Sequence, residues 1–433
     1  MSTFSNWSGS VQFRPNQVAY PTSEAEVQAL VRAVAQNGHG VRVVGTAHSF
    51  TPLIATDHCL ISLDRMQGLV GVDAATGDAT FWAGTKLWRM NELLHEQGRG
   101  LENLGDIDRQ SLAGIVSTGT HGTGLQFGSV PNQVREITLV RADGSLMTLS
   151  EATHPGTFKS AVLSLGTFGV LTRIRLRTIP AYRLKFVQTI EKLDAGLATL
   201  EEKVHGNRNF EFYWFPYTDV LQCKYVNETK EPARPKTFGT ILNEVVMENG
   251  AFKVLSSISK RVPGTTRSIA KICGWGVSAT TKVDWSHRVF VTPRWVKFQE
   301  MEYSMPKDAL ASAVRDIARM VERERIRVHF PVECRYVKGD DLPLSPAHGR
   351  DSAYVAVHMY RGMPYKKYFG EVEAIFRGHG GRPHWGKMHT LGAAQLKPLY
   401  PKWDEFQKLR REFDPSGVFL SPAARRLFED GAV

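Results

Sequence analysis

The sequence lacks several features that would assign it to a common class of protein. Its four cysteines are scattered along 433 residues and form no C-x-x-C pair. This argues against a disulfide framework or a zinc site and indicates a reducing compartment. No apolar run approaches the roughly 20 residues that a membrane-spanning helix needs. The N-terminus also lacks a basic region followed by an apolar stretch, the pattern of a signal peptide. We therefore predict a cytoplasmic protein without integral membrane association.

Two common nucleotide-binding signatures are also missing. The chain has neither G-x-G-x-x-G after a predicted strand nor G-x-x-x-x-G-K-[ST], so neither a Rossmann site nor a P-loop is supported. The net charge is +11, but lysines and arginines are spread along the chain and no nucleic-acid module accompanies them. We expect no nucleic-acid partner and interpret the charge as a solvated basic surface, with some attraction for an anionic cofactor or substrate.

The length predicts two or three domains, and the patterns divide the chain into sections. The first section alternates helices and strands, with a helix from Glu24 and a buried strand from Val41. Hairpins are predicted around Gly77 and around Asp143. From about residue 182 to 387, short aromatic-rich strands follow, and a helix is predicted over 403–413. The basic, moderately apolar stretch 252–279 suits either a surface helix pair or an interfacial membrane element; the helix pair is the interpretation we favour.

The strand from Val41 runs into a turn of small residues: Gly45, Thr46, Ala47, His48 and Ser49. Such a turn exposes backbone N–H groups that can bind a pyrophosphate. Gly45 allows a positive φ and the close approach of a ligand. His48 would then lie beside the bound group. The alternative is an ordinary turn with a solvated histidine, since such turns are common.

A second stretch, residues 103–124, is dense in Gly, Ser and Thr, yet apolar Leu112, Ile115 and Val116 anchor it in a core. This combination predicts a backbone that folds tightly around a ligand, with hydroxyl and N–H groups pointing inward. A purely structural glycine-rich loop is the alternative.

Two further segments contain candidate catalytic residues. In a strand, Glu333 and Arg335 point to one face, where they could orient a substrate hydroxyl and stabilise charge on its oxygen. His358 could reach the same pocket. Lys387 follows a Trp-Gly turn and could neutralise an anionic ring. The alternatives are an exposed ion pair, a structural histidine and an ordinary surface lysine.

Taken in order, these segments resemble the vanillyl-alcohol-oxidase-type flavoprotein family, and within it the sugar-1,4-lactone oxidases that act on L-gulono-, L-galactono- and D-arabinono-lactone. The resemblance spans nearly the whole chain and is strongest over 41–49, 103–124, 330–351 and 381–389. It implies a two-lobed α+β fold, with an FAD-binding domain at 1–181, a cap domain at 182–387 and a C-terminal segment at 388–433 that returns to the FAD domain.

The resemblance also implies roles for individual residues. His48 matches the position at which many relatives link covalently to the flavin. Glu333, Arg335 and Lys387 match catalytic residues, and Asp106 and His358 would contact substrate. Gly105 matches a position that controls oxygen access. The residues that match FAD-contacting stretches are Gly45, Thr46, Ala47, His48, Ser49, Gly105, Ser111, Gly114, Ser117, Thr118, Gly119, His121, Gly122, Gly124 and Val170.

We therefore expect hydride transfer from a lactone hydroxyl carbon to FAD, with oxygen as acceptor, hydrogen peroxide as product and no metal. Asp106 stands where alditol oxidases carry a substrate-binding serine, which weakens the second interpretation, a xylitol or sorbitol oxidase. A flavin dehydrogenase and an oxidase that tailors a natural product use the same scaffold. A basic binding protein without catalysis would lack flavin and colour.

Overall fold

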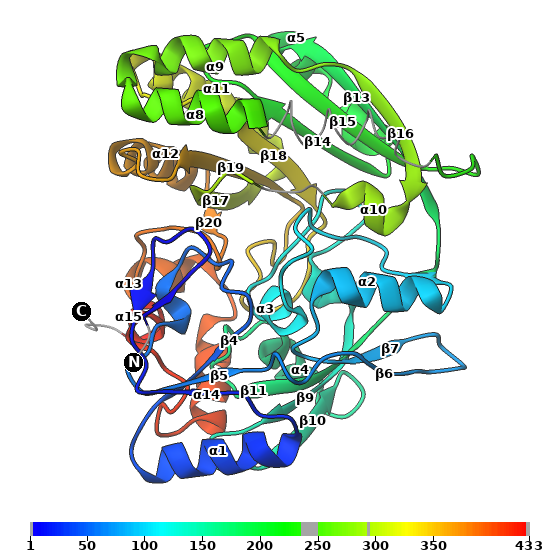
Figure 1. The fold of residues 1–433 in the computed structure, drawn as a ribbon, viewed down its shortest axis with the longest axis vertical. Coiled ribbons are helices and arrows are strands. Elements are labelled where there is room, and N and C mark those ends of the chain that lie inside the picture. Colours follow the sequence, from blue (N-terminus) through cyan, green and yellow to red (C-terminus); the bar gives the residue numbers. More distant parts are fainter. Residues whose placement is uncertain (1–2, 235–249, 292–294, 430–433) are drawn as a thin grey trace.

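The computed structural model describes residues 3–234, 250–291 and 295–429, which form two lobes stacked one above the other (Figure 1). Three main sheets build them. The lower lobe holds a parallel sheet in the order β3-β5-β4 and an antiparallel sheet in the order β10-β9-β11-β7-β6. The upper lobe is built on one antiparallel sheet in the order β16-β13-β15-β14-β18-β19-β17-β20. Helices and sheets are mixed in both lobes, as the α+β prediction requires.

The small parallel sheet begins the lower lobe. Helix α1 (Glu24–Gln36) starts where the Ser23 side chain accepts a hydrogen bond from the backbone N–H of Glu26, and it buries Val27, Val31 and Val34. It leads into β4, the strand predicted from Val41. The three strands are β3 (Gln17–Ala19), β4 (Val41–Val44) and β5 (Cys59–Ser62).

The five-stranded sheet completes the core of the lower lobe, and both predicted hairpins are part of it. β6 pairs with β7, and β9 pairs with β10 across the turn that contains Gly144 at φ +78°. Its strands are β6 (Leu69–Val72), β7 (Ala79–Trp82), β9 (Val134–Val140), β10 (Leu146–Ser150) and β11 (Val170–Leu176). Three helices accompany them: α2 (Leu87–Glu96), α3 (Leu112–Ser117) and α4 (Pro155–Val162).

The eight-stranded sheet of the upper lobe places its central strands over the lower lobe (Figure 1). Its strands are β13 (Arg183–Lys192), β14 (Asn209–Trp214), β15 (Val220–Glu228), β16 (Thr280–Trp285), β17 (Phe298–Pro306), β18 (Val332–Val337), β19 (Ser352–Tyr360) and β20 (Arg382–Pro383). Its helices are α5 (Leu193–Ala198), α6 (Leu200–Gly206), α8 (Ala251–Arg261), α9 (Thr266–Trp275), α10 (Ser286–Phe290), α11 (Leu310–Arg323) and α12 (Lys366–Gly378).

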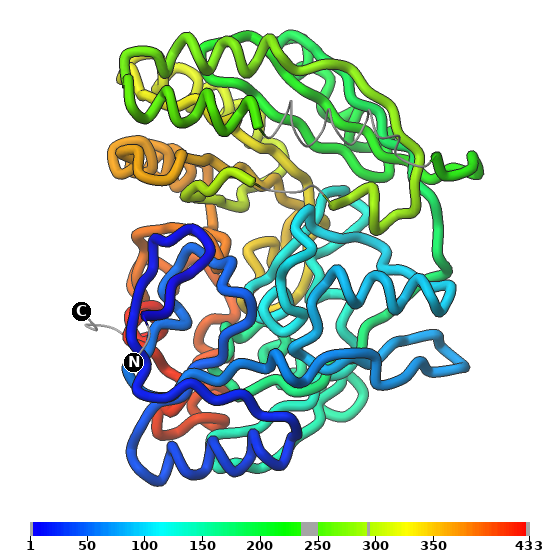
Figure 2. The backbone as a smooth tube through the Cα atoms, viewed as in Figure 1, coloured from blue at the N-terminus to red at the C-terminus, as the bar shows by residue number. Residues whose placement is uncertain are grey.

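The C-terminal chain lies among the N-terminal strands, at the lower left of Figure 2. It contains α13 (Ala393–Leu396), α14 (Trp403–Phe413) and α15 (Pro422–Phe428). The backbone N–H of Val41 bonds the carbonyl of Val418 at 2.7 Å. Ser421 accepts from the N–H of Ala424 at the start of α15 and donates to the carbonyl of Leu53 at 3.0 Å. Contacts between distant parts of the chain therefore fix β4 and the turn that follows it.

The stretch 252–279 forms the predicted helix pair, α8 and α9. Ser256 and Ser259 on the inner side of α8 meet the two ring nitrogens of buried His329 at 2.9 and 3.3 Å. Burial lowers the pKa of His329 to about 4, so the ring is neutral and can share hydroxyl hydrogen bonds on both sides. Among the described helices, none combines the length and apolar character that crossing a bilayer demands.

Candidate active site

A long cleft in the lower lobe opens between the turn after β4, the start of α2, and α3. It contains about 990 Å³ of empty space, counted together with the solvent at its open mouth. Gly45 forms its floor, where a Cβ atom would lie 2.0 Å from the Ser111 hydroxyl. Glycine is thus required at position 45 by the close approach of Ser111. The positive φ that Gly45 would allow is taken by Ala47 instead, at 52°.

Many predicted cofactor residues line this cleft together. They are Gly45, Thr46, Ala47, His48, Ser49, Ser111, Gly114, Ser117 and Thr118. Gly119, Gly122, Gly124 and Val170 are outside the lining, and the backbone N–H of Gly124 bonds the carbonyl of Tyr336 in the upper lobe instead. Val170 is fully buried in β11 while its neighbours Gly169 and Leu171 face the cleft. Lys86 and Arg42 add positive charge to a wall of small residues, and the buried Nε of Arg42 has no protein hydrogen-bond partner. A donor set of this kind suits a diphosphate-bearing cofactor.

His48 joins this cleft to a second cavity, because it lines both. Its ring stacks on Trp7 at 5.7 Å between centroids. Burial, followed by the charges of Lys387 and Lys86, lowers the pKa of His48 to about 4. The imidazole is therefore neutral near pH 7 and keeps a nucleophilic lone pair.

The second cavity lies beneath the central strands of the upper sheet. Gly105, Asp106, His121, Arg335 and Lys387 all line it, although they come from distant parts of the chain. Glu333 and His358 are not in the lining and lie behind Arg335 and Lys387. Side chains alternate along a strand, so Glu333 and Arg335 of β18 point to the same face of the sheet. This face is turned toward the cavity.

Arg335 is the centre of a buried ion-pair network. It contacts Glu333 on its own strand, Glu211 on β14 at 2.9 Å and Asp106 at 3.5 Å. Burial alone would lower the pKa of Arg335, but the three carboxylates raise it well above the usual value, so the guanidinium stays charged. Lys224 pairs with Glu211 at 3.0 Å from the far side. The network fixes the guanidinium at the cavity wall.

Lys387 lies opposite, in an ion pair with Glu300 of β17 at 2.5 Å. Burial would raise the pKa of Glu300, but Lys387 and His358 outweigh it and lower the pKa to about 2. Burial would likewise lower the pKa of Lys387, and the charges of Glu300 and Glu302 raise it instead. His358 lies 3.5 Å from Glu300 and 3.9 Å from Glu333, so it links the Lys387 and Arg335 groups.

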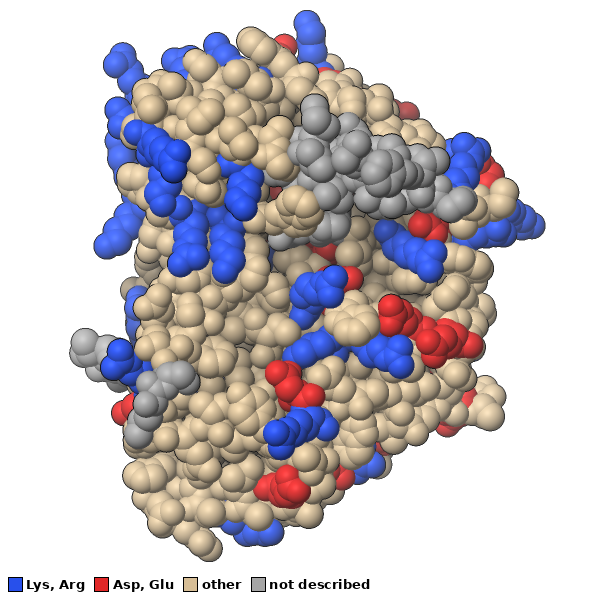
Figure 3. Space-filling view, viewed as in Figure 1, with Lys and Arg blue, Asp and Glu red and all other residues tan. Residues whose placement is uncertain are grey.

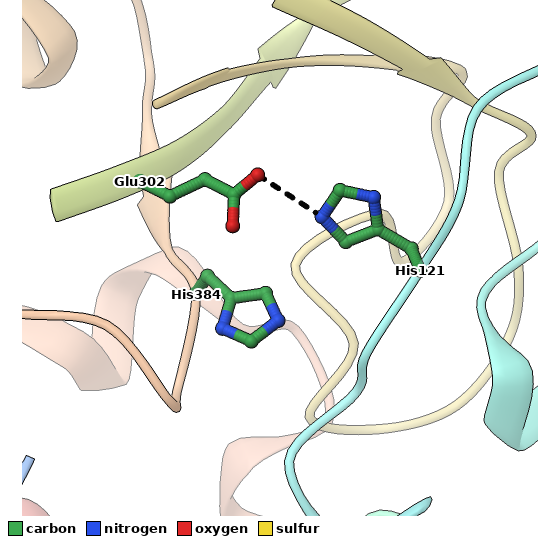
Figure 4. A group of neighbouring side chains, drawn as sticks. All are labelled: His121, Glu302 and His384. Carbon is green, nitrogen blue, oxygen red and sulfur yellow. Dashed lines mark ion pairs between the residues drawn. The ribbon is translucent and has the colours of Figure 1, made fainter. Parts of the chain in front are cut away.

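A third cluster consists of His121, Glu302 and His384, which point toward one another from three separate segments (Figure 4). Glu302 lies 3.3 Å from Nε2 of His121, and all three side chains are buried. Burial would raise the pKa of Glu302, but His121 holds it well below its usual range. The carboxylate therefore stays ionised inside the protein.

The spacing of these three residues would suit a metal ion, but their hydrogen bonds favour another interpretation. Nδ1 of His121 lies 2.9 Å from the carbonyl of Gly122 and donates to it, while Nε2 faces Glu302 at 3.3 Å. Nδ1 of His384 accepts from the N–H of Gly386 at 3.0 Å. Burial lowers the pKa of His384 to about 3, so its one proton is on Nε2. Both Nδ1 atoms are therefore engaged in hydrogen bonds and Nε2 of His384 carries a proton, so the cluster is a hydrogen-bond group rather than a set of free lone pairs.

Sequence reasoning missed Glu302, which lines this cavity, and three residues of the ion pairs around it: Glu211, Lys224 and Glu300. A signal existed in the spacing of Glu300 and Glu302, which places both carboxylates on one face of an otherwise apolar strand. Such a pair is costly to bury without partners, and the partners here come from other segments.

Comparison of the sequence with known protein families identifies the family of this chain. Residues 174–427 match the sequence profile of D-arabinono-1,4-lactone oxidase, and residues 15–150 match that of an FAD-binding domain. The chain belongs to the D-arabinono-1,4-lactone oxidase family. It is therefore an FAD-dependent oxidoreductase, as the resemblance implied.

The relatives align with almost the full length of the chain. The L-gulono-1,4-lactone dehydrogenase of Mycobacterium tuberculosis is 36% identical over 424 residues, 98% of each chain. The L-gulonolactone oxidase of Bos taurus is 29% identical over 98% of each chain, and the D-arabinono-1,4-lactone oxidase of Yarrowia lipolytica is 28% identical over 96% and 95%. A solvent-stable cholesterol oxidase aligns with a TM-score of 0.85 at 19% identity, over 98% and 97% of the chains. That likeness confirms the predicted two-lobed fold.

Proposed function

We propose that the protein oxidises a secondary hydroxyl of an aldono-1,4-lactone, with FAD in the lower cleft and the lactone in the second cavity. The observation that carries this proposal is the meeting of the two spaces at His48, where the charged wall of Arg335 and Lys387 faces the end of the cleft. When bound, FAD would accept the hydride from the substrate carbon. In this proposal residues 1–181 form the FAD domain, residues 182–387 form the cap domain and residues 388–433 return to the FAD domain.

The chain's own residues would hold and polarise the substrate hydroxyl. Arg335 keeps its charge and would stabilise the oxygen as its proton departs. Glu333, which Arg335 holds just outside the cavity lining, is proposed to accept the hydroxyl proton. Lys387 would place positive charge beside the cofactor ring. His358 would orient Glu333, and Asp106 would bind a second hydroxyl next to Arg335.

His48 is proposed as the residue that links FAD covalently. Its neutral ring and its place at the junction of the two cavities support this role. Gly119, Gly122, Gly124 and Val170 also stay proposed cofactor residues, although the lining of the cleft does not include them.

Oxygen is proposed as the electron acceptor. Gly105 lines the substrate cavity, and a Cβ atom there would lie 3.2 Å from the carbonyl of His121. Glycine thus allows this part of the cavity wall to pack closely on the His121 carbonyl, and a side chain at this position would crowd the wall. A dehydrogenase is the second candidate, because the Mycobacterium tuberculosis relative carries that name.

The test is hydrogen peroxide release by the purified protein on L-gulono-, L-galactono- and D-arabinono-1,4-lactone beside xylitol and sorbitol. Peroxide from a lactone and little from the alditols would support the proposal. Peroxide from alditols alone would refute the lactone assignment. Turnover of a lactone with a dye but not with oxygen would instead make the protein a dehydrogenase.

A further inference from the structure

One cation of the lower cleft, Arg42, is buried without an acidic partner. Its side chain lines the cleft, the residue is 5% exposed, and it forms no ion pair with any carboxylate in the described part of the chain. Burial lowers the pKa of Arg42 to about 10, with a partial offset from Asp414, so the guanidinium is still charged near pH 7. A buried charge that lacks a counterion destabilises the protein. An anion bound in the cleft would supply the missing counterion.

Lys86, which lines the same cleft, differs from Arg42 in this respect. Its Nζ lies 2.5 Å from the carboxylate of Asp64, whose side chain is 48% exposed. The charge of Lys86 is therefore already balanced, close to solvent. Figure 3 shows basic and acidic residues interspersed in the same way on the visible face of the lower lobe. Of these two cations, Arg42 is the one whose charge the protein itself leaves unbalanced.

The guanidinium of Arg42 joins three segments of the chain. Nη2 donates to the carbonyl of Leu165 at 2.9 Å, and Nη1 donates to the carbonyl of Phe419 and, at 3.4 Å, to that of Gly166. Leu165 and Gly166 line the cleft as well, and the backbone of Leu165 has a φ of 55°, in the left-handed region that favours glycine. Phe419 belongs to the C-terminal segment. One buried cation thus fixes both a wall of the cleft and the segment that returns to it.

The C-terminal side of this contact is a tight turn. The carboxylate of Asp414 accepts hydrogen bonds from the N–H groups of Val418 and Phe419, each at 2.8 Å. The carbonyl of Val418 accepts from the N–H of Val41, next to Arg42. Carbonyl oxygens satisfy the hydrogen bonds of a guanidinium but do not cancel its charge. Without an anion in the cleft, this turn therefore docks against an unbalanced positive charge.

The diphosphate of FAD is the anion that suits this cleft. We propose that Arg42 balances the charge of the diphosphate and thereby couples FAD binding to the docking of the C-terminal segment at Phe419. Such a coupling is reciprocal, so the docked segment strengthens FAD binding by the same factor by which FAD strengthens docking. This inference rests on the proposed place of FAD in the lower cleft and does not depend on the identity of the substrate.

FAD titration of the flavin-free protein tests the charge of Arg42. All proteins carry His48→Ala, so the flavin can be removed and added back whether or not the wild type forms a covalent link. Quenching of flavin fluorescence should show that Arg42→Met binds FAD at least about tenfold more weakly than this parent protein. Lys86→Met removes a cation of the same cleft that Asp64 already balances, and it should lose less than about threefold. Equal losses in the two variants would overturn the proposal.

The Arg42→Lys variant separates the charge from the three hydrogen bonds. An ammonium group keeps the positive charge but cannot reproduce the planar fork that reaches three carbonyls. Its affinity for FAD should therefore stay within about threefold of the parent protein. A tenfold loss in Arg42→Lys would make Arg42 a structural residue alone and would contradict the proposal, even if Arg42→Met does not fold.

Hydrogen exchange measured by mass spectrometry tests the coupling. In the parent protein, saturating FAD should slow amide exchange over residues 414–428 by at least about tenfold, while α8 in the upper lobe should change little. In Arg42→Met, saturating FAD should protect residues 414–428 much less. Equal exchange with and without FAD in the parent protein would refute the coupling. If FAD behaves as expected but no lactone bleaches the flavin, the proposed function fails and this inference stands, so the two failures are distinguishable.

Discussion

Replacing Lys387 with methionine separates the proposed chemical role of this lysine from its structural one. Methionine keeps much of the side-chain length and removes the charge. It leaves the Glu300 carboxylate, which is 7% exposed, without its nearest cation. Breaking a buried pair on one side costs about 3–5 kcal/mol of stability. If Lys387 also stabilises charge that develops on the cofactor, the rate of anaerobic flavin reduction should fall by about a hundredfold or more.

The Lys387→Met, Glu300→Gln double variant distinguishes these effects. It removes both charges, so it should recover most of the lost free energy of unfolding, measured by urea denaturation. Flavin reduction, measured by stopped-flow absorbance with the preferred lactone, should remain slow because the positive charge is still missing. A double variant that reduces its flavin at nearly the wild-type rate would refute the catalytic role and leave Lys387 as a structural partner of Glu300.

Further predictions concern other parts of the site. The His48→Ala variant should release all of its flavin on acid precipitation, whereas the wild-type pellet should stay yellow; a colourless wild-type pellet would rule out the covalent link. Gly105→Ala should slow turnover with oxygen while dye-linked turnover is kept, if the cavity wall that Gly105 lines gives oxygen its access to the flavin as proposed. Arg335→Lys should lower kcat/KM for the lactone by at least about tenfold, since an ammonium cannot reproduce the guanidinium's contacts with Glu333, Glu211 and Asp106. Glu300 has a pKa lowered from 4.5 to about 2, so it contributes stability that is present above about pH 4.5 and is lost as the pH falls toward 2. In Glu300→Gln, the free energy of unfolding should therefore fall less between neutral pH and about pH 3 than in the wild type.

Local patterns predicted the elements of the fold with their approximate bounds. The buried valines of α1 and β4, the hairpin turn at Gly144 and the helix over 403–413 each depend on residues within one segment. The order of the strands could not be predicted in this way. In the upper sheet, β17 pairs with β19 and β14 pairs with β18, and these contacts join residues far apart in the chain. The resemblance to a known family supplied the architecture that periodicity could not.

The same limit applies to the site. The face of β18 that carries Glu333 and Arg335 follows from strand alternation, and the glycine turn at Gly45 indicated a close approach. The partners of these residues did not follow, because Glu300, Glu302 and Glu211 act only through cations from other segments. The role of the His121 side chain was missed for a similar reason, since its chain neighbours are small residues and its partner Glu302 lies on a distant strand.

The most direct test of the central claim is the absorbance of the purified yellow protein when it is mixed anaerobically with each candidate substrate. The account predicts that one of the three 1,4-lactones bleaches the flavin band rapidly and that xylitol and sorbitol do not. Because oxygen is absent, the result does not depend on which acceptor the enzyme uses. Rapid bleaching by the alditols, with none by the lactones, would contradict the account.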